Sequence, residues 1–214
     1  MHEQHTQSFL PGRRRLGLHI RKSQSNHGFS LVEVLVSIVV LTFGLLGMVG
    51  MQAASLKSNR EARLQSSAVV LARELAEMIR GNRVVGVLPT NTNPYIGSFT
   101  AGAFTSTAGV PAYCLSVGTT ACANVTATAN AEMTEWLARV DAELPGVRVD
   151  VCYDSAPFDA NGLPQWACSA GGGIMVVKIG WVRGSTDKSK TDANAFDRAG
   201  TPSVVFPVTA GSST

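Results

Sequence analysis

One carboxylate in this chain lies in an apolar segment, where its charge would cost free energy. Glu33 is the single charged residue in the apolar run 29–56, and the next one is Lys57. Burying a carboxylate in a bilayer costs about 2.5–3.5 kcal/mol at the centre of the membrane and less near its edge. Glu33 therefore needs either a cationic partner or a position at the level of the lipid headgroups.

A free amine at residue 29 would supply such a partner. Cleavage after Gly28 would leave Phe29 with an amine that is cationic at neutral pH, because α-amino groups have an ordinary pKa of about 7.7–8.0. This amine would lie one helical turn from Glu33. It could neutralise the carboxylate in the same subunit, or in a neighbouring copy displaced along the helix axis by about a turn.

The element that carries both groups is a predicted membrane span. The apolar run 29–51 is long enough, at a rise of 1.5 Å per residue, to cross a hydrocarbon core of about 30 Å. Residues 1–28 hold five basic side chains and one acidic side chain. The positive-inside rule then places the N-terminus in the cytoplasm and everything after Lys57 outside.

A cleavable secretory signal is the alternative, because small residues occur at 53–55. The apolar run exceeds the roughly 7–15 residues of a signal-peptide core. Helical periodicity also continues beyond the run, with an apolar stripe at Leu64, Ala68, Leu71, Leu75 and Met78/Ile79. The sequence therefore predicts one long helix over about 29–80, which a cleavage near residue 55 would cut.

The junction before the span has a recognisable pattern. Gly28-Phe29-Ser30-Leu31-Val32-Glu33, after a basic leader, resembles the class III signal of type IV prepilins and type II secretion pseudopilins. The resemblance implies cleavage between Gly28 and Phe29 by prepilin peptidase and N-methylation of Phe29. It also implies that Glu33 sets the register of the subunit during assembly.

The continuation 63–83, with Ala72-Arg73-Glu74-Leu75-Ala76-Glu77-Met78-Ile79-Arg80-Gly81-Asn82-Arg83, resembles minor pilins of the PilV type. The resemblance implies a subunit of the inner membrane with a periplasmic head, which is incorporated into an extracellular type IV pilus. Its partners would be other minor pilins and the major pilin, through the N-terminal helix, and the assembly platform of the inner membrane. Initiation of the pilus, within a tip complex, is the expected role.

Two features depart from the family pattern. The leader is long, and Gly44, Gly47 and Gly50 stand where many major pilins carry a proline in the apolar helix. Glycine lowers helix stability by up to about 1 kcal/mol in water. Local melting of the helix during assembly is one interpretation of these glycines, and the ordinary composition of a membrane helix is the other.

The predicted organisation has four parts: a cleaved leader over 1–28, a transmembrane or filament-core half-helix over 29–56, an amphipathic half-helix over 57–83, and a periplasmic head over 84–214. The expected fold is α+β and pilin-like, with the long N-terminal helix packed on a C-terminal antiparallel sheet. The stretch between Arg83 and Glu132 has no charged residue and many turn formers.

Within the head, we expect short strands around 113–117, and a helix over 131–144 with Asn130 as its N-cap. Alternation predicts a strand over 147–154, followed by strands over 174–183 and 203–209. Pro207 cannot donate to a ladder, which favours an edge position for the last strand. An Asn124-Val125-Thr126 sequon is present, but we do not expect it to be used.

The cysteines Cys114, Cys122, Cys152 and Cys168 all lie on the side predicted to be outside. An even number in an oxidising compartment favours disulfides, of which three pairings are possible. We favour Cys114–Cys122 and Cys152–Cys168, because each pair encloses one local loop. A zinc site is the alternative, but it would need closely spaced pairs of ligands that this chain lacks.

Catalysis by a histidine is excluded in the processed chain, because all four histidines precede residue 29. Two groups, 154–162 and 187–197, faintly resemble calcium loops but lack the required spacing, so we expect turns there. We therefore predict no enzyme activity, no metal and no cofactor. Without its leader the chain carries a net charge of about −1, which gives no support for nucleic-acid binding.

Two further functions remain open. The same N-terminal pattern suits a type II secretion minor pseudopilin, which would push secreted proteins rather than build a surface fibre. A membrane-anchored binding domain that never polymerises is the third possibility.

Overall fold

A computed structural model describes residues 28–100, 103–105, 111–116, 118, 120–169, 172–184, 196–197 and 200–211. The chain divides into two compact units, Met1–Met51 and Gln52–Thr214. The predicted leader, apart from Gly28, and most of the second calcium-like group lie outside the described residues.

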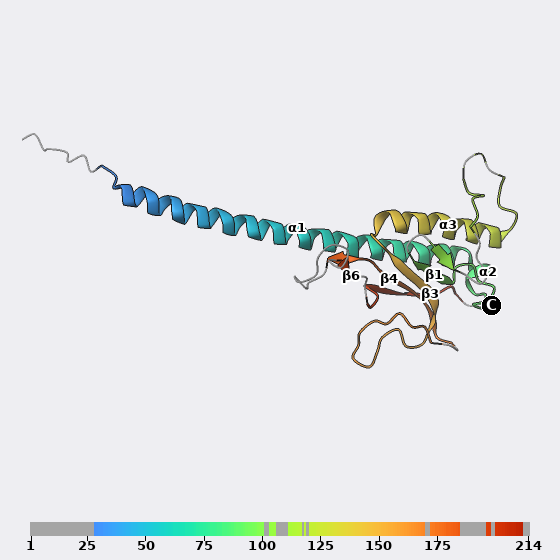
Figure 1. Ribbon diagram of the computed structural model, residues 1–214. Helices are drawn as coiled ribbons and strands as arrows, with labels where there is room; N and C mark the ends of the chain where they lie inside the picture. The colour runs from blue at the N-terminus through green and yellow to red at the C-terminus, as the bar shows by residue number, and fades with distance from the viewer. Residues whose placement is uncertain are drawn as a thin grey trace, which may run out of the picture. The chain divides into compact units, whose positions relative to one another are not determined.

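The long predicted helix is present as α1, Leu31–Gly81 (Figure 1). In the second unit its buried residues recur every three or four positions, which is the stripe that the sequence predicts. They are Ala68, Leu71, Ala72, Leu75, Ala76 and Ile79. The short helix α2, Arg83–Gly86, follows directly after α1.

The head of the second unit is built on a five-stranded antiparallel sheet in the order β2-β1-β3-β4-β7. The strands are β1 Gly97–Thr100, β2 Ala103–Thr105, β3 Arg148–Asp154, β4 Ile174–Gly180 and β7 Val204–Val208. A separate two-stranded ladder joins β5, Arg183–Gly184, to β6, Phe196–Asp197. The α+β class is confirmed, and β7 is an edge strand, as Pro207 predicts.

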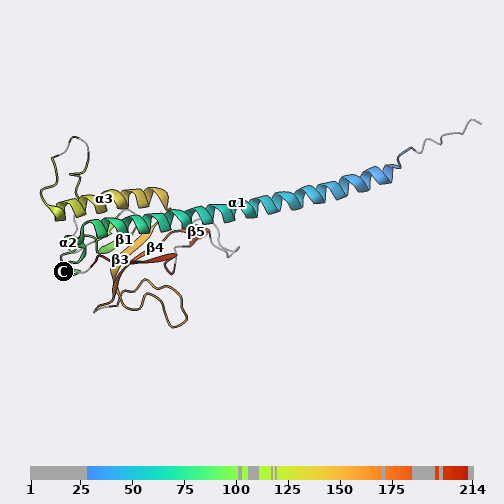
Figure 2. The same cartoon turned by 180° about the vertical axis from the view of Figure 1, so that it is seen from behind.

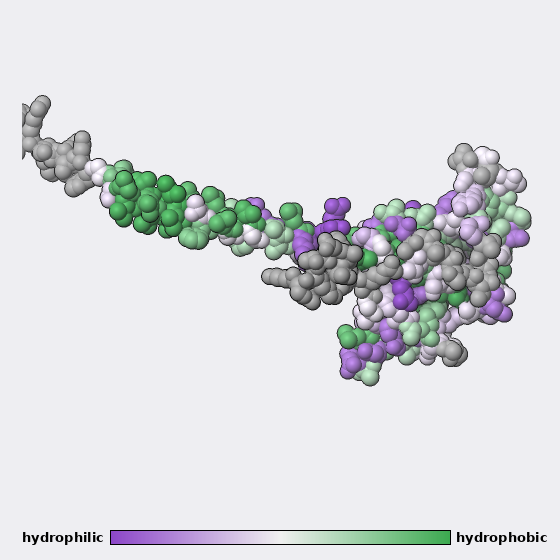
Figure 3. Space-filling model, in the orientation of Figure 1, coloured by the Kyte–Doolittle hydropathy of each residue, from purple (hydrophilic) through white to green (hydrophobic). Residues whose placement is uncertain are grey.

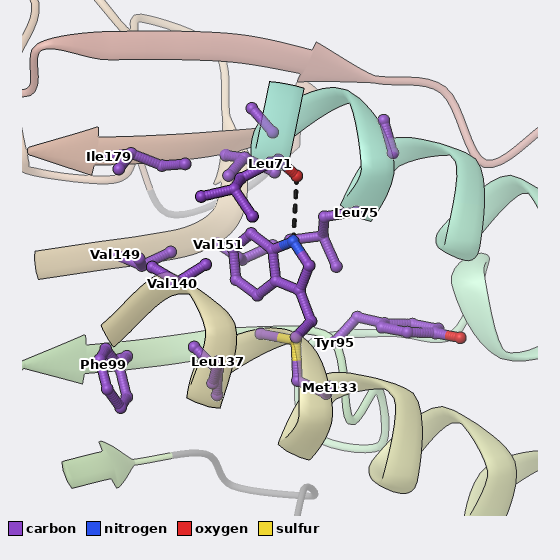
Figure 4. Packing of buried hydrophobic residues seen from close by; sticks show 14 of the residues in the cluster. Leu71, Leu75, Tyr95, Phe99, Met133, Leu137, Val140, Val149, Val151 and Ile179 are labelled. Carbon is purple, nitrogen blue, oxygen red and sulfur yellow. Dashed lines mark hydrogen bonds between the residues drawn. The ribbon is translucent and has the colours of Figure 1, made fainter. Parts of the chain in front are cut away.

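The core lies between one face of the sheet and two helices, the C-terminal part of α1 and α3, Val125–Glu143. Figures 1 and 2 show these helices side by side over the strands. Trp136 of α3 is fully buried, and its indole N–H donates to the carbonyl oxygen of Leu71 at 3.0 Å (Figure 4). Because this hydrogen bond satisfies the one polar atom of the indole, the ring can fill the centre of the core.

The prediction for the start of α3 was wrong. The helix begins at Val125, and Asn124 is its N-cap, with a side-chain oxygen that accepts from the Ala127 amide at 2.8 Å. Asn130, the expected cap, lies inside the helix with 9% of its surface exposed. The segment 126–131 alternates alanine, a strong helix former, with threonine and asparagine, which are weaker, and Ala129 and Ala131 are buried in the helix.

The expected strand around 113–117 was also wrong, because 113–116 form a turn in which the Ser116 amide donates to the Tyr113 carbonyl at 3.1 Å. The strands described in this charge-free region are β1 and β2, which are short and precede residue 113 in the chain.

The strand β4 ends at Gly180, before the expected end at residue 183. The Val182 amide does not continue the ladder and donates to the Pro145 carbonyl at 2.9 Å.

Candidate functional site

The first turn of α1 carries Glu33. The carbonyl oxygen of Ser30 accepts from the amides of Glu33 and Val34, at 2.9 and 3.2 Å, and this begins the helix. The carboxylate of Glu33 therefore belongs to the helix N-terminus, where the partial positive charge of the unpaired amides stabilises an anion.

The part of α1 that belongs to the first unit is apolar on every face. Its most apolar stretch has a mean hydropathy of 2.5 and no buried residue, and α1 is the single helix among the described residues that is long and apolar enough to cross a membrane. In Figure 3 this segment forms a continuous hydrophobic surface. The hydroxyls of Ser37 and Thr42 donate to the carbonyls of Glu33 and Val39, at 2.7 and 2.8 Å, so these polar groups suit an apolar environment.

Phe29 and Glu33 share one side of this segment. Both line a shallow groove together with Val34, Ser37, Ile38 and Leu41. Phe29 is 83% exposed. Glu33 is exposed as well. In a chain cleaved after Gly28, the new amine of Phe29 and the Glu33 carboxylate would therefore both be open to a second chain, which is the arrangement that pairing between subunits requires.

The three glycines of the apolar segment do not interrupt α1. At Gly44, Gly47 and Gly50, apart from the adjacent residues and the nearby backbone of α1 itself, no described atom lies within 4 Å of the place where a Cβ would stand. Packing within one chain therefore gives no reason for glycine, and the two interpretations of these residues stay predictions.

In the head, the cysteines form the two favoured pairs. Cys114–Cys122 closes the turn before α3, and Cys152–Cys168 ties the end of β3 to the loop that precedes β4. Among the described residues, no cysteine is free. Each disulfide therefore restrains one loop of the head.

The loop between β3 and β4 covers a buried ion pair. Lys178 and Asp154 are 0% and 1% exposed, and the ammonium lies 2.6 Å from the carboxylate and 2.7 Å from the Ala167 carbonyl. Burial acts to raise the pKa of Asp154, but hydrogen bonds from Lys178, Ala156 and Ser169 lower it to about 2. The pair thus holds this loop on the sheet as a charged, fully bonded group.

The first calcium-like group forms turns, as expected. The Oδ1 atom of Asp159 accepts from the amides of Asn161 and Leu163, both at 2.8 Å, and Gly162 has a φ of +77°. Through these two hydrogen bonds, the Asp159 side chain stabilises the turn at 159–163.

A second candidate site lies on the sheet face opposite the helices and was not found from the sequence. It is a cavity of about 200 Å³, here called the indole cavity, lined by Ser98, Thr100, Arg148, Asp150, Trp166 and Trp181, together with two glycines. Alternation along β3 does place Arg148 and Asp150 on one face. The other members come from β1, from the β3–β4 loop and from the end of β4, so no spacing in the sequence connects them.

Comparison with known proteins identifies the N-terminal segment alone. A family model described as the prokaryotic N-terminal methylation motif matches residues 23–49. No curated protein matches the chain, and no solved structure does so either. The motif supports a precursor of the pilin or pseudopilin kind, processed by prepilin peptidase and methylated, and the apolar part of α1 fits its membrane anchor.

Proposed function

We propose that this chain is the precursor of a minor pilin of the PilV type, which after cleavage and methylation enters a type IV pilus and helps to initiate it within a tip complex. One observation carries the proposal. A segment that matches the N-terminal methylation motif also forms a fully exposed apolar helix whose single carboxylate lies in the first turn. The likeness of 63–83 to PilV-type minor pilins supports the finer assignment.

In this proposal each part of the chain has one task. Residues 1–28 are the leader that prepilin peptidase removes after Gly28. Residues 29–56 anchor the subunit in the inner membrane, with the head in the periplasm, and later form filament core. Residues 57–83 attach the helix to the head, 84–214, which other minor pilins contact.

Assembly follows from the electrostatics of the apolar helix. A Glu33 carboxylate surrounded by apolar helices is strongly destabilised unless a cation neutralises it. The methylated amine of Phe29 in a neighbouring subunit supplies that cation in one axial register only, because a shift by a turn separates the charges. Pairing therefore selects the register, while non-directional apolar contacts hold the helices together.

The role is structural, with no catalysis and with no metal or cofactor. The processed chain has no histidine, and its four cysteines are in disulfides. Among the described residues of the head, polar side chains are engaged in turns, in the ion pair of Asp154 with Lys178, and in the cluster of Ser98, Arg148 and Asp150.

The decisive experiment is the intact mass of the protein extracted from membranes, with its N-terminal sequence. We expect a chain that begins at Phe29 and is one methyl group heavier than its sequence. A chain that begins near residue 55 would instead indicate an ordinary signal peptide, and it would overturn the role of Glu33.

Deletion of the gene would distinguish between the three candidate functions that are compatible with this N-terminal segment. Loss of surface pili with normal protein secretion is the expected result. Loss of secreted enzymes with normal pili would indicate a type II secretion pseudopilin. Neither defect would indicate a membrane-anchored domain that does not polymerise.

A further inference from the structure

A groove with basic residues in its lining lies in the second unit, where the end of α3 meets α1. Its volume is about 490 Å³, within the range of about 300–1,000 Å³ that is typical of small-molecule sites. Six residues of α1 and one of α3 form the lining: Leu56, Asn59, Arg60, Arg63, Leu64, Ser67 and Glu143. The α1 members follow the helical repeat, so they share one face of the helix. We call this site the basic groove.

The cations of this region are not neutralised within the described part of the chain. Lys57, Arg60 and Arg63 are exposed, and none of them forms an ion pair with a described residue. The acidic residue among them, Glu61, is paired with Arg183, whose Nε atom lies 2.7 Å from the carboxylate. Like charges one turn apart on a helix repel each other, so an anion between Arg60 and Arg63 would be stabilising.

The lining has the donors that a phosphate group needs. Guanidinium groups bind phosphate oxygens through two parallel hydrogen bonds. The side-chain amide of Asn59 and the hydroxyl of Ser67 add uncharged donors. Glu143 is the one carboxylate of the lining, so with Arg60 and Arg63 the groove has a net charge of +1. This charge matches a phosphodiester, which carries a single negative charge.

The spacing along α1 matches the thickness of a bilayer. Arg60 follows Glu33 by 27 residues, which is about 40 Å in a continuous helix at 1.5 Å per residue. A bilayer with its headgroups is about 40–45 Å thick. With Glu33 at the headgroups of one leaflet, Arg60 reaches those of the other. This placement rests on the proposed membrane anchor at 29–56, but not on assembly into a filament.

Basic residues at this flank of the span run against the positive-inside rule, which disfavours them on the outer side. Lys57, Arg60 and Arg63 nevertheless follow the span within seven positions. Removal of the leader would also take five basic side chains from the opposite flank. In the processed chain, the side-chain cations next to the span would then lie on the outer side.

We propose that the basic groove binds the phosphate of an anionic phospholipid in the outer leaflet of the inner membrane. Arg60 and Arg63 bind the phosphate oxygens, and Asn59 donates to the headgroup. The leucines of the lining contact the apolar part of the lipid. The bound lipid holds this part of α1 at the membrane surface until the subunit enters a filament.

Lipid retention is measured by native mass spectrometry on the whole mature chain, released from nanodiscs that contain phosphatidylcholine and phosphatidylglycerol in equal amounts. We expect preferential retention of phosphatidylglycerol, and a higher melting temperature in that lipid than in phosphatidylcholine. Equal retention of both lipids would overturn the proposal. Displacement of the lipid by soluble glycerol 3-phosphate would assign the groove to a free phosphate instead. Dimers in place of a lipid preference would show that a second copy covers it.

Two matched pairs of substitutions locate the site. Arg60→Gln with Arg63→Gln should lower the preference about tenfold, because each basic residue near an anionic surface contributes roughly a factor of five in affinity. Arg73→Gln with Arg80→Gln removes the same charge from exposed positions of α1 outside the groove, and it should leave the preference unchanged. The first pair should melt like the unsubstituted chain in phosphatidylcholine, since both side chains are exposed. Equal losses of preference in the two pairs would overturn the site.

The same mass spectra keep this inference separate from the proposed function. A chain that begins at Phe29 but shows no lipid preference would overturn the lipid site alone. A chain that begins near residue 55 would lack the anchor, and it would overturn the proposed function on which the site rests.

Discussion

In the proposed assembly, Glu33 would experience two environments with opposite demands. In the membrane, its position in the first turn of α1 would keep the carboxylate near the bilayer edge and near unpaired helix amides, which would limit the free-energy cost of its charge. In a filament, apolar helices would surround the same group. A residue that is tolerated before assembly and requires a partner afterwards can drive register without preventing insertion.

Removing this carboxylate should separate insertion from assembly. We expect Glu33→Ala to insert normally, because the span becomes more apolar, and to fall at least tenfold in sheared filaments. Immunoblots of membrane and filament fractions measure the two outcomes. Glu77→Ala is the matched control, since Glu77 is an exposed glutamate of the same helix that pairs with Arg80 on the surface. Normal incorporation of the Glu33 variant would contradict the register mechanism.

The Asp154–Lys178 pair should make the stability of the head depend on acid. The folded-state pKa of Asp154, about 2, lies below its ordinary value of 3.8. The ionised Asp154 carboxylate therefore contributes about 2 kcal/mol to the free energy of unfolding of the head above pH 4. This contribution is lost as the pH falls toward 2. Near-UV circular dichroism melts of the detergent-solubilised protein between pH 5 and pH 2 measure this loss.

A pair of variants tests the same network at neutral pH. Asp154→Ala should destabilise the head by about 3–5 kcal/mol, because it leaves the Lys178 ammonium buried and uncompensated. The double variant Asp154→Ala with Lys178→Met should recover part of this loss. Equal stability of the single and double variants would show that burial of an unpaired charge is not the cause.

The start of α3 depends on one side chain. Asn124→Ala should destabilise the head by about 1 kcal/mol, because the Ala127 amide loses its acceptor, whereas Asn124→Asp keeps an acceptor and should be nearly neutral. Thermal melts of the three proteins measure the difference. Equal losses in both variants would contradict capping and would indicate another role for the asparagine side chain.

The two disulfides close loops of different length, with sequence separations of 8 and 16. Chain entropy predicts about 3 kcal/mol for each. The Cys152–Cys168 bridge should matter more, because its loop also supplies the Ala167 carbonyl to Lys178. We expect Cys152→Ser with Cys168→Ser to lower the melting temperature further than Cys114→Ser with Cys122→Ser. The reverse order would show that the loop stays on the sheet without its bridge.

Charge is distributed unevenly over the whole chain, and this governs its affinity for polyanions. The basic excess belongs to residues 1–28, and the remainder carries about −1. We expect the mature protein not to retard duplex DNA in a gel at low salt, and the uncleaved precursor to bind weakly in a salt-dependent way. Retardation by the mature chain would contradict this and would indicate a basic surface in the head.

The N-terminal motif and the long helix could be predicted because they depend on residues close together in the chain. The span, the stripe from Leu64 to Ile79 and the junction at Gly28 are each defined within a few helical turns. The edge position of β7 followed from a single proline. Local loops likewise favoured the disulfide pairs, since short loops lose little entropy on closure.

Errors arose where packing overrides local preference. Residues 126–131 have mixed helix propensity, because threonine and asparagine alternate with alanine, and the segment is helical with Ala129 and Ala131 buried against the core. The strands β1 and β2 have little alternation and depend on pairing with each other and with β3. Propensities of a few tenths of a kcal/mol per residue are easily outweighed by such burial and pairing.

The sequence by itself determined the N-terminal methylation motif and the long apolar helix with its single charge, because both are defined by residues that are neighbours in the chain. Only the tertiary structure decided what the head brings together. Ser98, Arg148 and Trp166 meet because strand register and a folded-over loop place distant segments side by side. Register depends on the summed pairing and burial of whole strands, so no short stretch of sequence determines it.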